Sequence, residues 1–234
     1  MPSPHMVVAT AKERFMTDTP VKPYKGRGME GFVASWYARQ TAHDSAEFER
    51  TARRIADLLN PSSRVLEIAP GPGYLAIALA RLTGGRITGL DISRTFVRIA
   101  AENARQAGVA VDFEQGDAAD LPFPDGQFDF IVCRAAFKNF TRPLVALNEM
   151  HRVLKEGGTA LIIDLRKDYS PRAVSDYCKD RGFVSAVIIK LTFRTMLKSR
   201  AYSKESMMGL VAQSQFGQGE ISLDPIGFEL WLRK

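Results

Sequence analysis

Residues 64–79 read RVLEIAPGPGYLAIAL and decide the fold. An apolar run leads into Gly71 and Gly73, and apolar residues at helical spacing follow at once. Glycine lets the backbone turn sharply and lets a ligand approach closely, and the helix N-terminus behind it favours polar or anionic ligand groups. Pro70 and Pro72 stiffen the turn. The stretch therefore predicts a strand, a ligand-binding turn and a helix.

The same alternation of patterns continues along the chain. Strands are expected at 64–69, 86–92, 111–116, 128–133 and 159–165. Helices are expected at 44–59, 74–82, 95–108 and 143–154, the last ended by Gly157 and Gly158. Two later strands, 219–224 and 227–234, predict an antiparallel hairpin at the sheet edge. Strands alternating with helices predict an α/β fold with a doubly wound, mostly parallel sheet.

Two less regular segments accompany this pattern. Residues 1–43 are expected to be a flexible N-terminal segment, because VKPYKGRGMEG at 21–31 mixes Pro, Gly and cations, and a short helix at 32–39 would complete a lid. Residues 44–234 are expected to form the main domain. A helical insertion is expected at about 166–203, followed by a helix at 204–214 capped by Ser203.

Composition excludes several classes of protein. Hydrophobic residues make up 45% and charged residues 25%, which is typical of a folded domain rather than a disordered or fibrous chain. No apolar run is long enough to span a membrane and no signal peptide is seen, so a cytoplasmic protein is expected. Two cysteines exclude a disulfide framework. The net charge of +6 permits an anionic partner without identifying one.

Acidic residues near the ends of the early strands suggest a cofactor. Asp91 ends the second strand, where an α/β fold places a carboxylate beside a bound ribose. GPGYLA also fits the G-x-G-x-x-A form of a dinucleotide-binding motif, so a nicotinamide cofactor stays open. Glu67 favours a positively charged cofactor instead, because an acid just before the turn would crowd a pyrophosphate but could bind a cationic amino-acid group. Asp117 could accept a hydrogen bond from an exocyclic amine, with Leu121 and Phe123 as apolar neighbours of an adenine ring.

Over about residues 62–165 the chain resembles the class I S-adenosylmethionine-dependent methyltransferases, in particular the small-molecule branch that includes quinone-biosynthesis C-methyltransferases. Glu67, Ala69, Gly71 and Gly73 match its acid-x-Gly-x-Gly-x-Gly motif, with Ala69 where the first glycine usually stands. The resemblance implies seven strands, the last antiparallel.

The resemblance also implies which residues bind S-adenosyl-L-methionine. The implied set comprises Glu67, Ala69, Pro70, Gly71, Gly73, Asp91, Ile92, Asp117, Ala118, Arg134 and Ala135. Asp91 would hold the ribose hydroxyls and Ile92 would pack on adenine. Asp117 with the Ala118 backbone would bind the adenine edge. Arg134 would lie beside the methionine portion, as would Ala135.

Candidates for the chemistry are few, because methyl transfer can proceed by positioning alone. His43 could take a proton from the acceptor, although a solvated linker histidine explains it as well. Tyr24 and Tyr37 lie in the expected lid, where either could bind the cofactor carboxylate or line the acceptor pocket. Lys138 follows the fourth strand and could contact acceptor or cofactor. The three histidines show no metal-ligand spacing, so no metal is expected.

We therefore expect an enzyme that transfers a methyl group from S-adenosylmethionine to an O, N or C atom of a small organic acceptor. An RNA methyltransferase is also considered, because of the net charge of +6 and the stripe Lys190, Arg194 and Lys198, although nucleic acid is the less favoured partner. A nicotinamide-dependent oxidoreductase and a cofactor-binding protein without catalysis stay open as well. The sequence does not identify the acceptor or the oligomeric state.

Overall fold

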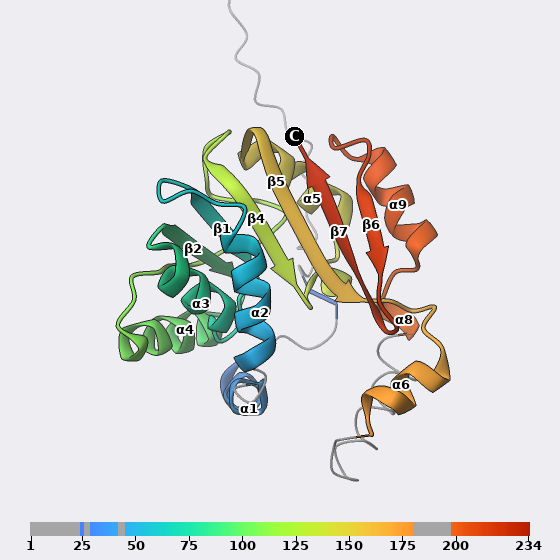
Figure 1. Cartoon of the computed structure of the whole chain (residues 1–234), viewed down its shortest axis with the longest axis horizontal. Coiled ribbons are helices and arrows are strands. Elements are labelled where there is room, and N and C mark those ends of the chain that lie inside the picture. The colour runs from blue at the N-terminus through green and yellow to red at the C-terminus, as the bar shows by residue number, and fades with distance from the viewer. Residues whose placement is uncertain (1–23, 26–28, 42–44, 180–197) are drawn as a thin grey trace, which may run out of the picture.

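The computed structural model describes residues 24–25, 29–41, 45–179 and 198–234. Seven strands form one sheet in the order β3-β2-β1-β4-β5-β7-β6 (Figure 1). The strands are β1 (Arg64–Ile68), β2 (Arg86–Asp91), β3 (Asp112–Gln115), β4 (Phe128–Arg134), β5 (Leu154–Leu165), β6 (Glu220–Leu223) and β7 (Gly227–Arg233). The first five are parallel, and β7 pairs antiparallel with both β5 and β6. The predicted α/β doubly wound, mostly parallel seven-stranded sheet with an antiparallel C-terminal hairpin is confirmed.

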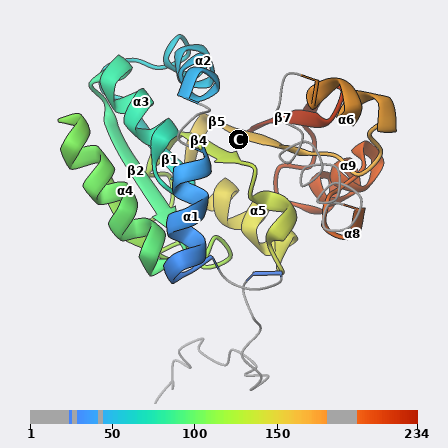
Figure 2. The same cartoon turned by 90° about the horizontal axis from the view of Figure 1, so that it is seen from below.

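Helices cover both faces of the sheet, as seen from below in Figure 2, with α2, α3 and α4 on one face and α5 and α9 on the other. The helices are α1 (Gly31–Thr41), α2 (Ser45–Ala56), α3 (Tyr74–Thr83), α4 (Arg94–Ala107), the short 3₁₀-helix η2 (Phe137–Asn139), α5 (Pro143–Val153), α6 (Pro171–Tyr177), α8 (Lys198–Arg200) and α9 (Lys204–Gln213). The predicted insertion contains α6 and α8, while residues 180–197 lie outside the described residues.

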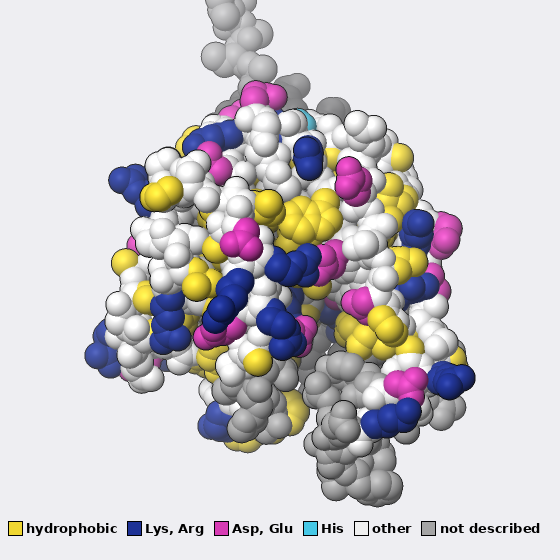
Figure 3. All heavy atoms as spheres, viewed as in Figure 1, with side chains coloured by type: hydrophobic (Ala, Val, Ile, Leu, Met, Phe, Trp, Pro, Cys, Tyr) yellow, Lys and Arg dark blue, Asp and Glu magenta, His cyan; other side chains and the backbone are white. Residues whose placement is uncertain are grey.

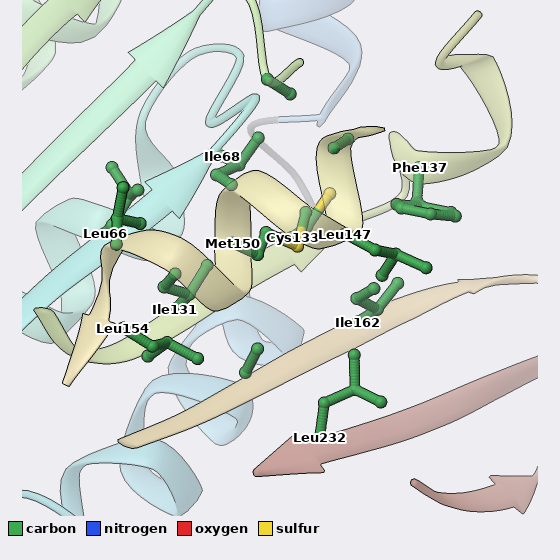
Figure 4. Packing of buried hydrophobic residues seen from close by; sticks show 14 of the residues in the cluster. Leu66, Ile68, Ile131, Cys133, Phe137, Leu147, Met150, Leu154, Ile162 and Leu232 are labelled. Carbon is green, nitrogen blue, oxygen red and sulfur yellow. The ribbon is translucent and has the colours of Figure 1, made fainter. Parts of the chain in front are cut away.

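The core is divided by the alternation of strand side chains. In β4, Ile131 and Cys133 pack toward α5, whereas Phe130 and Val132 belong to the cluster on the α3 side. Figure 4 shows the α5 side, where Met150 lies over these strands. Successive residues of a strand point to opposite faces, so a strand covered on both faces must be apolar throughout. Cys133 is therefore a core residue.

Two predicted boundaries are wrong. The helix expected at 143–154 ends at Val153, and Leu154 starts β5 by pairing with Phe128. Gly157 and Gly158 do not end that helix, because they exchange backbone hydrogen bonds with Lys234 at the C-terminus. The decisive contact lies far away in sequence.

The second wrong boundary concerns the helix expected at 44–59, which ends at Ala56. The amides of Leu58 and Leu59 donate to carbonyls three residues back, so the chain tightens into a turn before Pro61.

Gly73, in the loop between β1 and α3, cannot be replaced without strain. Its φ is +82°, and a Cβ there would lie 2.8 Å from the Phe113 ring and 2.9 Å from Ala100. Gly84, after α3, has a φ of +59° but open space around it. Gly84→Ala should lower the free energy of unfolding by about 1 to 2 kcal/mol through the left-handed backbone alone. Gly73→Ala should lose about 1 to 3 kcal/mol more, because neighbours must also move. Equal losses in urea denaturation would contradict this packing.

Candidate active site

The candidate site lies at the carboxyl ends of β1, β2 and β4, where α/β folds bind ligands. The loop after β1 turns through three left-handed residues, Ala69 (φ 57°), Gly71 (φ 55°) and Gly73. A Cβ on Gly71 would meet no atom within 4 Å, so the space beside this turn is open. Ala69 keeps its conformation at a cost of about 1 to 2 kcal/mol, which glycine would avoid.

Asp91 connects this loop to β2. Its side chain is only 5% exposed, and its carboxylate accepts hydrogen bonds from the Gly71 amide (3.0 Å) and the Ser93 amide (2.8 Å). Burial raises the pKa of Asp91, which these amides partly offset. Asp91 therefore holds the loop in place, and its role toward a ribose stays a prediction. Ile92 follows Asp91, and its carbonyl accepts from the Gln115 side chain at 3.2 Å.

Glu67 is a buried acid on the α3 face of β1. It is 3% exposed, and the Ala76 amide in the first turn of α3 donates to it. Its Oε2 atom is buried without a hydrogen-bond partner among the described residues. Burial raises the pKa of Glu67 to about 8, although Ala76 and Arg134 favour the charged form. An orphaned buried carboxylate oxygen beside the loop fits a cationic ligand group.

Asp117, after β3, already has a cationic partner. Its carboxylate accepts from Arg142 at 2.7 Å and from the Ala119 amide at 2.9 Å. Ala118 is buried. The sequence did not predict Arg142 as the partner of Asp117, because the two residues lie 25 positions apart and no motif links them. An adenine amine at Asp117 would share this carboxylate with Arg142.

Leu121 and Phe123 are both buried, and their predicted place beside an adenine ring stays a prediction. Both belong to the main core cluster, and the Phe123 ring meets Phe128 edge-on at 5.0 Å. Leu121 donates its amide to Glu149 at 2.8 Å.

Arg134 ends β4, and Ala135 follows it. The Arg134 guanidinium donates to Glu47 of α2 and lies 4.6 Å from the centre of the Phe48 ring. Ala135 has a left-handed φ of 58°, so both loops that meet at this edge carry a strained alanine. Arg134 thus joins α2 to the site and adds positive charge beside Glu67.

Lys138 is held by Asp164 at the end of β5. Its ammonium donates to the Asp164 carboxylate at 2.7 Å, and its amide donates to the same group at 2.8 Å. The side chains are 12% and 1% exposed, so this is a buried ion pair. Lys138 therefore fixes the loop after β4, and sequence reasoning missed its partner Asp164.

The N-terminal segment lies against this edge of the sheet. Glu30 accepts hydrogen bonds from the amides of Arg94 and Thr95 at the start of α4, and Gly31 donates to the Thr95 hydroxyl. Tyr37 on α1 meets Phe96 edge-on at 5.9 Å. His43 lies outside the described residues. The structure thus places Tyr37 against α4, its role toward a cofactor stays a prediction, and the sequence did not indicate Glu30.

Tyr24 lies beside the segment that follows η2. It forms an isolated antiparallel bridge with Phe140, just after η2. Burial raises the pKa of Tyr24, and the charges acting on it include Asp91 and Asp164. The Tyr24 phenol is therefore within electrostatic reach of both Asp91 in β2 and Asp164 in β5.

Comparison with known proteins identifies the central part of the chain. Residues 66–162 match the family model described as a methyltransferase domain. A 2-phytyl-1,4-naphtoquinone methyltransferase of Synechococcus elongatus is 38% identical over 132 residues, 54% of this chain and 57% of that protein. A demethylmenaquinone methyltransferase of Thermus thermophilus is 37% identical, over 49% of this chain and 54% of that protein. The chain thus spans about half the length of the curated relatives that it matches.

Solved structures with the same fold cover more of the chain. A Methanococcus maripaludis protein assigned to the S-adenosyl-L-methionine-dependent methyltransferases superposes with a TM-score of 0.72 at 21% identity, covering 90% of this chain and 95% of that one. The [4+2]-cyclase SpnF superposes with a TM-score of 0.54 at 21% identity, covering 80% and 81%. At these identities the likeness establishes the fold and leaves the reaction to the site residues.

Two further observations concern the described residues only. None of their helices has the length and apolar character needed to cross a bilayer. They contain no group of three or more His, Cys, Asp or Glu side chains placed to hold a metal ion.

Glu67 should make stability depend on pH. Its pKa is about 8 in the folded protein against 4.5 as its ordinary value, so between these pH values the folded state holds the extra proton. The free energy of unfolding should therefore fall as pH rises through this window, by an amount on the order of 3 kcal/mol at pH 7. Glu67→Gln should remove that fall, as read from urea midpoints at pH 5 and 8. Glu114 is exposed on β3, so the control variant Glu114→Gln should show the same fall in the free energy of unfolding as the unaltered protein. An unchanged slope in Glu67→Gln would contradict the assignment.

Proposed function

Because residues 66–162 match a methyltransferase domain, we propose that this chain transfers a methyl group from S-adenosyl-L-methionine to a carbon, oxygen or nitrogen atom of a small organic acceptor. The favoured acceptor is a quinol ring, since the Synechococcus and Thermus relatives are methyltransferases of quinones. The observation that carries the proposal is the unpartnered, buried Glu67 oxygen beside the open loop at Gly71. We also propose that the protein is located in the cytoplasm.

The residues present fit this cofactor. Glu67 would attract the ammonium of its methionine portion, which would satisfy the orphaned oxygen. The open space at Gly71 would let the ligand approach the backbone. Asp91 would accept hydrogen bonds from the ribose hydroxyls. Ile92 and Asp117 would flank the adenine, as the resemblance implies. The side chain of Arg134 adds a cation that suits the methionine carboxylate.

Positioning is the main task of these side chains. The bound cofactor supplies an electrophilic methyl group on a sulfonium. Asp91 and the Gly71 amide fix the loop that receives it, and Lys138 with Asp164 fixes the loop after β4. Holding two reactants in contact can supply effective molarities of about 10⁵ M or more. Tyr37 and α1 cover this edge and would exclude water.

An oxidoreductase and an RNA methyltransferase are less well supported. A nicotinamide oxidoreductase would place a pyrophosphate near Glu67, where the buried acid is unfavourable, and the domain match favours methyl transfer. RNA binding was suggested by Lys190 and Arg194, which lie outside the described residues, as does the side chain of Lys198.

A binding experiment tests the proposal. Calorimetry with S-adenosylhomocysteine and, separately, NADH should show tight binding of the first and little of the second. Transfer of a labelled methyl group to a menaquinol lacking its ring methyl should then follow. Preferential NADH binding would overturn the proposal, and binding without any transfer would leave a cofactor-binding protein.

Asp91 should dominate the affinity for the nucleoside. Asp91→Asn keeps an acceptor oxygen for one of the two backbone amides and removes the charge that would face the ribose. Binding of S-adenosylhomocysteine should weaken by about 10- to 150-fold, the range for losing charged hydrogen bonds. Asp112 is exposed at the start of β3, so the matched control Asp112→Asn should bind S-adenosylhomocysteine normally. Normal affinity in a folded Asp91→Asn protein would refute the assignment.

The N-terminal segment is predicted to be a lid that orders when cofactor binds. Amide hydrogen exchange of residues 21–39 should slow on adding S-adenosylhomocysteine, because closure protects the segment. Removing residues 1–39 should abolish turnover with little loss of thermal stability. Slow exchange without ligand, or unfolding on truncation, would show that the segment is structural.

A further inference from the structure

A second group of polar side chains lies beside the site, at the carboxyl ends of β4 and β5. The Lys25 amide donates to the Asn139 carbonyl at 2.8 Å, which holds the N-terminal segment against η2. Tyr202 forms a parallel bridge with Arg166 after β5, and its ring lies 5.8 Å from Phe137. Arg200 ends α8, two residues before Tyr202. We call Tyr24, Lys25, Arg200 and Tyr202 the tyrosine–cation cluster.

Lys25 has only neutral partners in this cluster. Its ammonium lies 3.5 Å from the Tyr202 hydroxyl, 3.4 Å from the Lys138 carbonyl and 5.4 Å from the centre of the Tyr202 ring. The side chain is half-buried, and the charge that acts on it most is Arg200, of the same sign. Burial, and then Arg200, lower the pKa of Lys25. Among the described residues neither cation forms an ion pair.

The Asp164 carboxylate, whose charge acts on Tyr24 and Tyr202, does not neutralise these cations. Asp164 is occupied by the ammonium and amide of Lys138, and by the Leu165 amide. Arg166 is paired with Asp168 at 2.8 Å. Two like charges kept partly out of water without a counter-ion are unfavourable, and an anionic ligand would relieve that cost.

Tyr24 supplies an uncommitted donor at the same place. Its phenol is half-buried, and its hydroxyl makes no hydrogen bond within the described part of the chain. Both Asp91 on the cofactor side and Arg200 in the cluster act on it electrostatically. Tyr24 bridges to Phe140 and Lys25 bonds to Asn139, so a ligand group within reach of both would lie beside the loop after β4, which also borders the proposed cofactor site. The rings of Phe137 and Phe140, 5.2 Å apart, provide apolar surface beside the cluster.

We propose that the tyrosine–cation cluster binds the ionised hydroxyl of an aromatic acceptor, with Lys25 and Arg200 supplying charge and Tyr24 donating a hydrogen bond. This inference rests on the proposed function, since it assigns the acceptor side of that site. The cluster selects the phenolate from solution, so the proton of the hydroxyl goes to solvent. An ionised phenol is a stronger nucleophile at oxygen and at the adjacent ring carbon, which prepares the acceptor for a methyl cation equivalent.

Ultraviolet titration of 1-naphthol tests the inference without turnover. The protein is saturated with S-adenosylhomocysteine and titrated from pH 6 to 10, since the phenolate absorbs at longer wavelength than the phenol. The bound naphthol should ionise about 1 to 3 pH units lower than free naphthol, the range for a nearby opposite charge. Lys25→Met and Arg200→Met should each reverse much of this shift, whereas Lys25→Arg should preserve it.

Arg53→Met is the matched control. Arg53 is 69% exposed on α2, and Figure 3 shows a group of Lys and Arg side chains over that helix. This variant removes one positive charge from the molecule but none from the cluster, so the bound naphthol should titrate as in the unaltered protein. An equal effect of Arg53→Met would show that net charge alone shifts the naphthol, and would overturn the inference.

A competition measurement uses only the unaltered protein and does not depend on how the variants fold. With S-adenosylhomocysteine bound, 2-naphthoate should displace 1-naphthol at least about tenfold better than the neutral 2-naphthamide, since a charged hydrogen bond contributes that much. Equal competition, an unshifted naphthol or no naphthol binding would overturn the inference while the proposed function stood. Failure to bind S-adenosylhomocysteine at all would overturn the proposed function and the inference with it.

Discussion

The site depends on one buried carboxylate, that of Asp91. It accepts from the Gly71 amide in one loop and from the Ser93 amide at the start of α4. Removing it would leave these amides without their acceptor, at about 1 to 3 kcal/mol each if they stayed buried. The glycine turn, the N-terminus of α4 and the end of β2 are therefore coupled. α1 docks on this same corner through Glu30 and Thr95.

Three buried carboxylates lie at this edge, and the fold treats each differently. Asp91 is held by backbone amides, and Asp164 is neutralised by Lys138 in an ion pair. Glu67 has one amide donor and one orphaned oxygen, so its burial is the least compensated. Such incompletely satisfied groups lower stability and persist where a ligand completes them. On physical grounds alone, Glu67 is thus the strongest sign of a binding site among the three.

The two sides of the site come from different parts of the chain. Glu67, Asp91 and Asp117 lie within the residues that match the methyltransferase domain, 66–162. Lys25, Arg200 and Tyr202 lie outside it and meet only because the N-terminal segment and the insertion both return to the ends of β4 and β5. The same fold occurs in a cyclase, so the fold does not determine the reaction. Residues outside the matched domain must therefore contribute to the choice of reaction.

The sequence by itself determined the alternating strands and helices, the glycine loop and the acids at the strand ends, because each depends on local backbone geometry and periodicity. It did not predict the early start of β5, since the pairing of Leu154 with Phe128 joins residues distant along the chain. The partners of Asp117 and Lys138 were hidden for the same reason. Charge type can be read from a sequence, but whether a charge is paired, buried or left for a ligand depends on neighbours that only the tertiary structure brings together.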